Sequence, residues 1–371
     1  MRPSFASFPH AATRLAAIRL AAAGLAALAL GACGDDGGGD PDAPAPDAQL
    51  DAPTDAGTDG GFVAPTMLSE TGLYSDIGAK TIAAGVVEFR PRWELWSDEA
   101  VKRRWILLPP DTQIDTSDMD FWSFPVGTKL WKEFVRGGDR IETRLLQKIG
   151  PDDENASWFM VAFQWDSGET DAVAVPGGVV DDQGVNDIPD RAKCRQCHGS
   201  NRNPGVGLGF SALQLDYDAG AGGMDLERLV AEDRLTVEPT GAAPYFPLPA
   251  ETGAPVIEPA LGYLHANCGG CHNPRSDVAM NTVPVQLRLL TAAEHRSSWA
   301  VTPTYATAVN VLATLGSAGS HLVRPADTAQ SAVYNRLNLV GGLQMPPVGR
   351  ELVDPTGVAA VAAWIDSLPP P

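Results

Sequence analysis

The sequence predicts an α+β protein in which an N-terminal antiparallel β domain is followed by mainly α-helical modules. Short apolar runs alternate with turn residues before Val180, which is typical of antiparallel strands. Beyond Val180, helical spacing and glycine-rich loops replace that pattern, and Asp354 and Pro355 suit the start of a final helix. We expect five parts: residues 1–32, 33–61, 62–180, 181–249 and 250–371.

The expected β domain, residues 62–180, is rich in tryptophan. Seven of the nine tryptophans lie between Trp93 and Trp165. They can line a ligand groove, but we favour a core role because large aromatic side chains dominate burial in such domains. Gly137-Gly138-Asp139 and Asp166-Ser167-Gly168 are expected turns between strands. The expected strands are 104–108, 128–135, 141–146 and 158–165.

The N-terminus has the features of an export signal. Three arginines and no acidic residue accompany an apolar run from Leu20 to Leu30 that is too short to span a bilayer. The run ends in Leu30-Gly31-Ala32-Cys33, which resembles the lipobox of bacterial lipoproteins. That resemblance implies removal of residues 1–32 and attachment of lipid to Cys33, which would anchor the protein to a membrane of the bacterial cell envelope. The alternative is a soluble periplasmic protein.

The composition of residues 33–61 predicts a disordered tether. After Cys33 the segment holds eight aspartates and no basic or aromatic residue, so it cannot bury enough apolar surface to order itself. The whole chain has a formal net charge of −19. This charge argues against nucleic acid as a partner. It suits a basic redox partner protein, although an acidic, soluble surface explains it equally well.

All five cysteines can be accounted for only if they are modified. Besides Cys33 there are four others, in two pairs with the same spacing. An odd number is difficult to reconcile with disulfides in an exported protein. Every cysteine has a role if Cys33 carries lipid and the other four form thioethers. Those four are Cys194, Cys197, Cys268 and Cys271.

Both cysteine pairs belong to a CxxCH motif, the attachment motif of c-type haem. Two thiols at i and i+3 can add to the two vinyl groups of one haem, and the adjacent histidine, His198 or His272, then binds the iron. We therefore expect two covalently bound haem c groups. A zinc site would not require the two histidines. A thioredoxin-like site would need a βαβ unit, which the sequence lacks.

Met345 is the expected sixth ligand of the second haem. It is followed by two prolines in a loop before the final helix. A braced thioether can bind iron and raise its reduction potential relative to histidine ligation. The alternative is that Met345 fills a gap in the core, as methionine often does.

The sixth ligand of the first haem is left open by the sequence. Met224 lies in a glycine-rich loop, and His265 lies in a helix that enters the second motif. A residue of the β domain is a third possibility. An open sixth position is a fourth, and would favour small-molecule chemistry over electron transfer.

The segment from Tyr263 to Leu368, with its CxxCH motif, Met345 and a terminal helix around Trp364, resembles a cytochrome c domain. From Glu94 onward the chain also resembles a family of bacterial dihaem lipoproteins, through Glu94-Leu95-Trp96-Ser97-Asp98, Arg104-Trp105-Ile106 and Phe124-Pro125-Val126-Gly127-Thr128. The last of these is faintly similar to the cytochrome P460 β fold. The resemblance implies that the helical modules are cytochrome c-like haem modules.

These features together predict a membrane-anchored dihaem cytochrome that transfers electrons in the bacterial cell envelope, facing the periplasm or the cell exterior. One alternative is a dihaem, peroxidase-like oxidoreductase with one open haem. Another is a ligand-binding β domain with the haems as its redox output. We expect no other catalytic residues, because no Ser-His-Asp, paired-carboxylate or phosphate-loop arrangement stands out.

Overall fold

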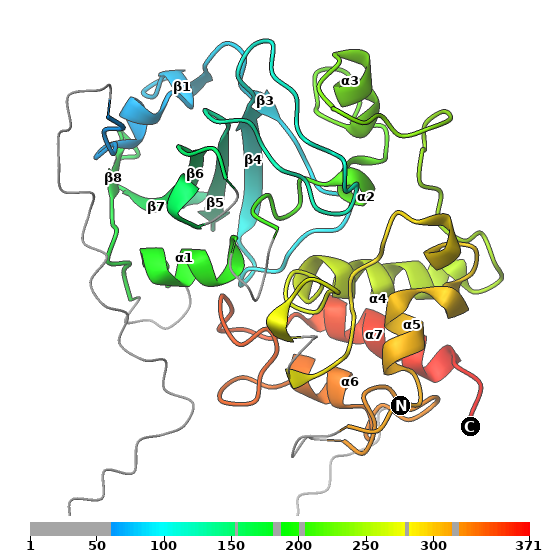
Figure 1. Ribbon diagram of the computed structural model, residues 1–371. Helices are drawn as coiled ribbons and strands as arrows, with labels where there is room; N and C mark the ends of the chain where they lie inside the picture. The colour runs from blue at the N-terminus through cyan, green and yellow to red at the C-terminus, as the bar shows by residue number, and fades with distance from the viewer. Residues whose placement is uncertain (1–60, 153–154, 181–186, 200–204, 279–281, 314–318) are drawn as a thin grey trace, which may run out of the picture. The chain divides into compact units, whose positions relative to one another are not determined.

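In a computed structural model, the first part of the described chain folds into a six-stranded antiparallel sheet (Figure 1). The structure describes residues 61–152, 155–180, 187–199, 205–278, 282–313 and 319–371. The expected signal peptide, Cys33 and nearly all of the tether lie outside these residues. Residues 62–371 form one compact unit.

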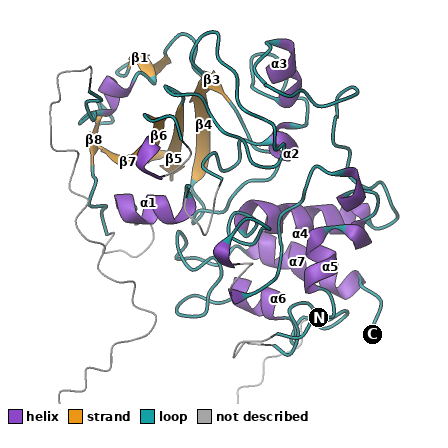
Figure 2. Cartoon of the chain, in the orientation of Figure 1, coloured by secondary structure: helices purple, strands orange, loops and turns teal. Residues whose placement is uncertain are grey.

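The strands of this sheet follow one another in sequence order, as in a meander (Figure 2). They are β3 (Val87–Glu88), β4 (Val101–Leu107), β5 (Lys129–Arg136), β6 (Asp139–Lys148), β7 (Trp158–Trp165) and β8 (Ala172–Ala174). A separate two-stranded sheet contains β1 (Tyr74–Asp76) and β2 (Thr81–Ile82). The predicted antiparallel sheet and the four expected strands are therefore confirmed.

A tight turn at Gly137 and Gly138, together with a register shift between Phe134 and Val135, sets the pairing of β5 with β6. The two glycines have φ values of 62° and 103°, which side chains with a β-carbon rarely adopt. Arg136 pairs directly with Asp139 across the turn. Because side chains alternate along a strand, this register decides which of them share a face of the sheet.

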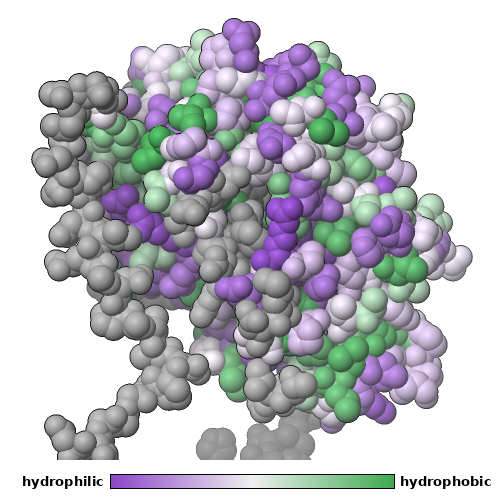
Figure 3. Space-filling view, in the orientation of Figure 1, coloured by the Kyte–Doolittle hydropathy of each residue, from purple (hydrophilic) through white to green (hydrophobic). Residues whose placement is uncertain are grey.

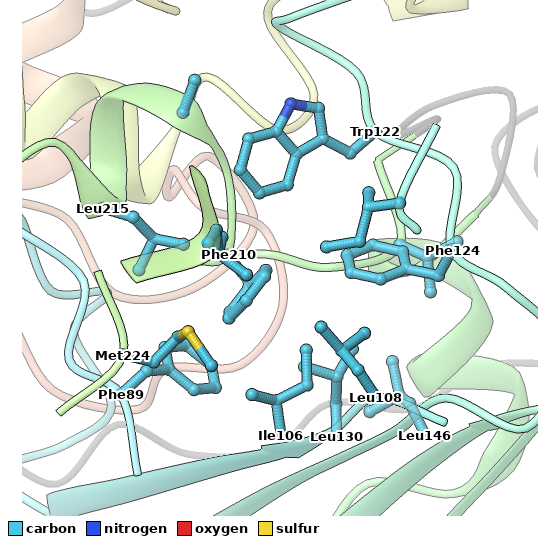
Figure 4. Close-up of a cluster of buried hydrophobic side chains, with 14 of the residues drawn as sticks. Phe89, Ile106, Leu108, Trp122, Phe124, Leu130, Leu146, Phe210, Leu215 and Met224 are labelled. Carbon is cyan, nitrogen blue, oxygen red and sulfur yellow. The ribbon is translucent and has the colours of Figure 1, made fainter. Parts of the chain in front are cut away.

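Each face of the sheet carries an apolar row that crosses four strands. On one face Trp105, Trp131, Leu145 and Val161 are aligned. On the other, Ile106, Leu130, Leu146 and Met160 are aligned and pack against Phe124 and Phe210 (Figure 4). The core role of the tryptophans is confirmed for five of the seven in this region, which are buried: Trp105, Trp122, Trp131, Trp158 and Trp165.

Helices separated by long loops follow the sheet. They are α1 (Arg191–Cys197), α2 (Ala212–Leu215), α3 (Leu226–Ala231), α4 (Ala254–Asn267), α5 (Pro303–Ala308), α6 (Ala332–Leu337) and α7 (Pro355–Ser367). The order of a β-sheet followed by helices is as predicted. The helices are short apart from α4 and α7, because glycine and proline interrupt this part of the chain.

The two long helices, α4 and α7, pack against each other. The Asp354 side chain accepts a hydrogen bond from the Thr356 amide and Pro355 opens α7, which confirms the expected start of the final helix. Val361, Trp364 and Ile365 of α7 are fully buried. No helix among the described residues has both the length and the apolar character needed to cross a membrane, and Figure 3 shows polar and apolar side chains intermixed on the face in view.

Hydrogen bonds join the segment before β4 to the helical part. The Trp96 amide donates to Oδ1 of Asn267, at the end of α4, over 2.7 Å. Oδ1 of Asp98 accepts from the amides of Glu351 and Leu352, just before α7, over 3.0 and 2.7 Å. The segment that leads into the sheet is thereby tied to both long helices.

The packing of α4 against α7 predicts that replacing Gly357 with alanine destabilises the protein. A β-carbon at Gly357 would lie 2.2 Å from the Tyr263 ring. Gly357→Ala should therefore lower the free energy of unfolding by about 1–3 kcal/mol in a guanidinium titration, although alanine favours helix. The control Gly177→Ala meets no atom within 4 Å and should stay within about 0.5 kcal/mol of wild type. A Gly357→Ala protein as stable as wild type would contradict the packing.

Candidate functional site

Helix α1 presents the first cysteine pair. Asp190 caps the helix, and its side chain accepts a hydrogen bond from the Lys193 amide over 2.7 Å. Cys194 and Cys197 lie three residues apart in the helix, so their side chains share one side of it. Cys194 belongs to the same apolar cluster as Leu130 and Leu146, which places it against that face of the sheet.

His198 directly follows this helix, and one of its ring nitrogens already has a hydrogen-bond partner. Its Nδ1 lies 2.7 Å from the carbonyl oxygen of Val206, which makes Nδ1 the protonated nitrogen and Nε2 the one with a lone pair. Desolvation, with a smaller contribution from the charges of Lys132 and Arg144, lowers the pKa of His198 to about 4. The ring is therefore neutral at pH 7, as a metal-binding imidazole must be.

The second cysteine pair lies in a tight turn at the end of α4. The amide of His272 donates to the carbonyl of Cys268 over 2.9 Å. A β-carbon at Gly269 would lie 2.6 Å from the His265 carbonyl oxygen, so this position requires glycine. Asn273 donates from Nδ2 to the carbonyls of Gly269 and Gly270 over 3.1 and 2.6 Å. The motif pattern alone assigns no role to Gly269 or Asn273.

His272 is also held in its neutral form. Burial lowers the pKa of His272, and the charge of Arg336 acts in the same direction. The Val285 carbonyl opposes this shift, although Nδ1 of His272 makes no well-formed hydrogen bond in the structure. Both histidines of the CxxCH motifs are therefore desolvated imidazoles, and His198 also has a hydrogen bond that fixes its ring.

The four cysteines of the motifs are thiols, without disulfide bonds between them. Desolvation raises the pKa of Cys194 and Cys197 to about 11 and that of Cys268 to about 12. Such thiols stay protonated at neutral pH. They are available for addition to a vinyl group and do not resemble the low-pKa cysteines of redox enzymes.

Both CxxCH motifs belong to the one compact unit formed by residues 62–371, although they are far apart in the sequence. The thiolate form of Cys271 would raise the pKa of the Cys197 thiol, second only to the effect of burial.

Two cations of the sheet lie beside the first motif. Lys132 of β5 and Arg144 of β6 are directly paired, and the charges of both act on Cys197 and His198. Arg144 also acts on Cys194. Sequence reasoning missed these residues, because only the strand register shows which lysines and arginines face the motif.

Met345 lies in a loop connected to the surroundings of the second motif. Its amide donates to the Arg336 carbonyl over 3.0 Å, and the charge of Arg336 acts on His272. Arg350, at the other end of the loop, donates to the carbonyls of Arg336 and Leu339, and its charge acts on Cys268. Met345 itself is half-buried.

The two sequence candidates for the sixth ligand of the first haem are engaged elsewhere. Met224 is buried in the apolar cluster with Phe89, and its amide donates to Glu88 (Figure 4). Nδ1 of His265 accepts a hydrogen bond from the Leu289 amide over 3.1 Å, and its ring meets the edge of Trp93. Both side chains have structural partners.

The donor set of the two motifs fits haem better than a bare metal ion. Each motif supplies two thiols and one neutral imidazole. Among the described residues, no group of three or more His, Cys, Asp and Glu side chains is arranged to hold a metal ion. No protein-family model, curated protein or solved structure matches this chain.

The cap of α1 gives a testable prediction. Asp190→Ala removes the side-chain acceptor for the Lys193 amide, and should lower the free energy of unfolding by about 1 kcal/mol. Asp190→Asn keeps an acceptor oxygen and should retain most of the stability. Denaturant titrations of both variants test this, and equal losses in the two would show that the cap contributes nothing.

Proposed function

We propose that this protein is a dihaem c-type cytochrome that transfers electrons. The observation that carries this proposal is the geometry of the first motif: Cys194 and Cys197 share one side of α1, and Nδ1 of His198 faces the Val206 carbonyl, which leaves Nε2 for iron. The second CxxCH motif repeats the same residues at the same spacing.

The residues of each motif have separate roles in this proposal. Cys194 and Cys197 would attach one haem and Cys268 and Cys271 the other, each through two thioether bonds. His198 would bind one iron through Nε2, because its Nδ1 faces the Val206 carbonyl, and His272 would bind the other. When bound, haem supplies a reversible one-electron couple, and the protein sets its potential through ligands, burial and charge.

Met345 would complete the second site. The hydrogen bonds from Met345 and Arg350 to the Arg336 carbonyl hold its loop beside the elements that carry Cys268 and His272. A thioether ligand stabilises ferrous over ferric iron, so this site would have the higher potential of a histidine–methionine haem. The part of the chain from Tyr263 to Leu368 would then be a cytochrome c-like module.

The remaining parts of the chain suit a protein of the bacterial cell envelope. Lipid on Cys33 would anchor it to a membrane, and residues 34–61 would let the folded part reach a partner. The acidic charge would favour a basic electron-carrier protein. The six-stranded sheet would support the first haem, because Cys194 and Lys132 lie on the same face of it.

The haem count tests the cofactor. Mature protein from a host with c-type maturation should carry two haems that survive acid–acetone extraction and add two haem masses. Changing both Cys268 and Cys271 to Ser should leave one haem. Changing Cys33 to Ser is the matched control and should leave two. An unshifted wild-type mass would refute the proposal.

Replacement of Met345 tests the second site. Met345→His should keep that haem low-spin and lower its midpoint potential, because imidazole stabilises ferric iron relative to a thioether. Met345→Ala should open the site to carbon monoxide, measured by difference spectra. Met224→Ala is the control and should leave the carbon monoxide response as in wild type. Unchanged spectra and potentials in both Met345 variants would show that this residue only packs.

A further inference from the structure

We propose that the side-chain amine of Lys132 is the sixth ligand of the haem attached at Cys194 and Cys197. This inference rests on the proposed function, since it requires a haem at the first motif. The inference assigns the role of sixth ligand to a residue of the β-sheet. Met224 and His265, the two candidates from the sequence, already contact Phe89 and Leu289.

The register of the sheet places Lys132 in the centre of a cationic row. Lys132 pairs with Arg104 of β4 on one side and with Arg144 of β6 on the other. The row lies next to the apolar row of Leu130 and Leu146, on the same face, because side chains two residues apart along a strand point the same way. Cys194 packs in the cluster formed by that apolar row.

The position of Lys132 relative to the first motif agrees with this placement. Its charge acts on His198, the proposed ligand on the opposite side of the iron, and on Cys197. The Lys132 side chain is strongly desolvated and yet keeps some accessible surface.

Lys132 differs from its two neighbours in lacking an acidic partner. Arg104 lies 3.6 Å from Glu94, and Arg144 lies 2.5 Å from Glu142. Among the described residues, Lys132 has no carboxylate within ion-pair distance; its charged group lies 4.8 Å from the centre of the Phe134 ring. Burial and the neighbouring Arg104 and Arg144 disfavour the ammonium form of Lys132, and the charge of Glu142 offsets this only from beyond ion-pair distance.

Lys132 would hold a haem iron at this site through its neutral amine, whose lone pair is free to bind a metal. Any proton on the nitrogen would go to water, as protons of ligands do on metal binding. No electron transfer would be involved. An arginine at the same position could not do this, because guanidinium keeps its protons and has no free lone pair.

Isotope labelling tests the ligand without a mutation. The full-length, haem-loaded protein is produced with ¹⁵N only in lysine, and the oxidised form is examined by pulsed EPR. We expect hyperfine coupling from ¹⁵N at one low-spin haem, because only a coordinated amine brings that nucleus next to the iron. Two haems without any ¹⁵N coupling would overturn this inference and leave the dihaem proposal intact. Absence of covalent haem would instead overturn the proposed function.

Substitutions at Lys132 separate ligation from charge. Lys132→Leu and Lys132→Arg should both convert one of the two haems to a high-spin form that binds carbon monoxide. Lys102→Leu is the matched control: Lys102 is another desolvated lysine on the same face of the sheet, opposite Phe134, and its loss should leave both haems low-spin. Low-spin spectra in both Lys132 variants would overturn the proposal. If the variants fail to fold, the isotope measurement on wild type decides.

Discussion

The register between β5 and β6 is the constraint on which the first site depends. A register shift between Phe134 and Val135, just before the turn at Gly137 and Gly138, places Trp131 opposite Leu145 on one face and Lys132 opposite Arg144 on the other. A further slip of β6 by one residue would exchange the faces of its side chains. Leu145 would then leave the row of Trp131, and Arg144 would leave the row of Lys132.

The second constraint is the connection between the segment before β4 and the long helices. Asn267 accepts a hydrogen bond from Trp96 one residue before Cys268, and Asp98 accepts two from the chain just before α7. The positions of Cys268 and of the Met345 loop are thus coupled to the strand that follows Asp98. This coupling gives a physical reason for the two CxxCH motifs to meet in one compact unit.

Much of the fold could be predicted from local sequence patterns. Trp158 to Trp165 forms a strand with the expected bounds, and Asp354 and Pro355 begin α7 as expected, because capping and alternation are properties of neighbouring residues. The CxxCH motifs were equally visible, because their chemistry lies within five residues. The prediction that the later modules are mainly helical was less successful, because glycine and proline limit most of these helices to one or two turns.

What local patterns could not provide was the set of contacts between distant segments. Lys132 and Arg144 resemble ordinary polar positions of alternating strands until the register places them in one row. The effect of Cys271 on Cys197 depends on the path of the whole chain between them. Val206, which orients His198, and Gly269, which permits the turn of the second motif, acquire their roles only from backbone positions in three dimensions.

The central claim is that the two motifs hold neighbouring haems, and magnetic coupling tests it most directly. EPR spectra of the fully oxidised protein should be compared with those of the single-haem form that lacks Cys268 and Cys271. Two adjacent ferric haems should show dipolar broadening and faster spin relaxation of the first haem, and both effects should vanish in the single-haem form. A two-haem spectrum equal to the sum of two isolated haems would contradict the account.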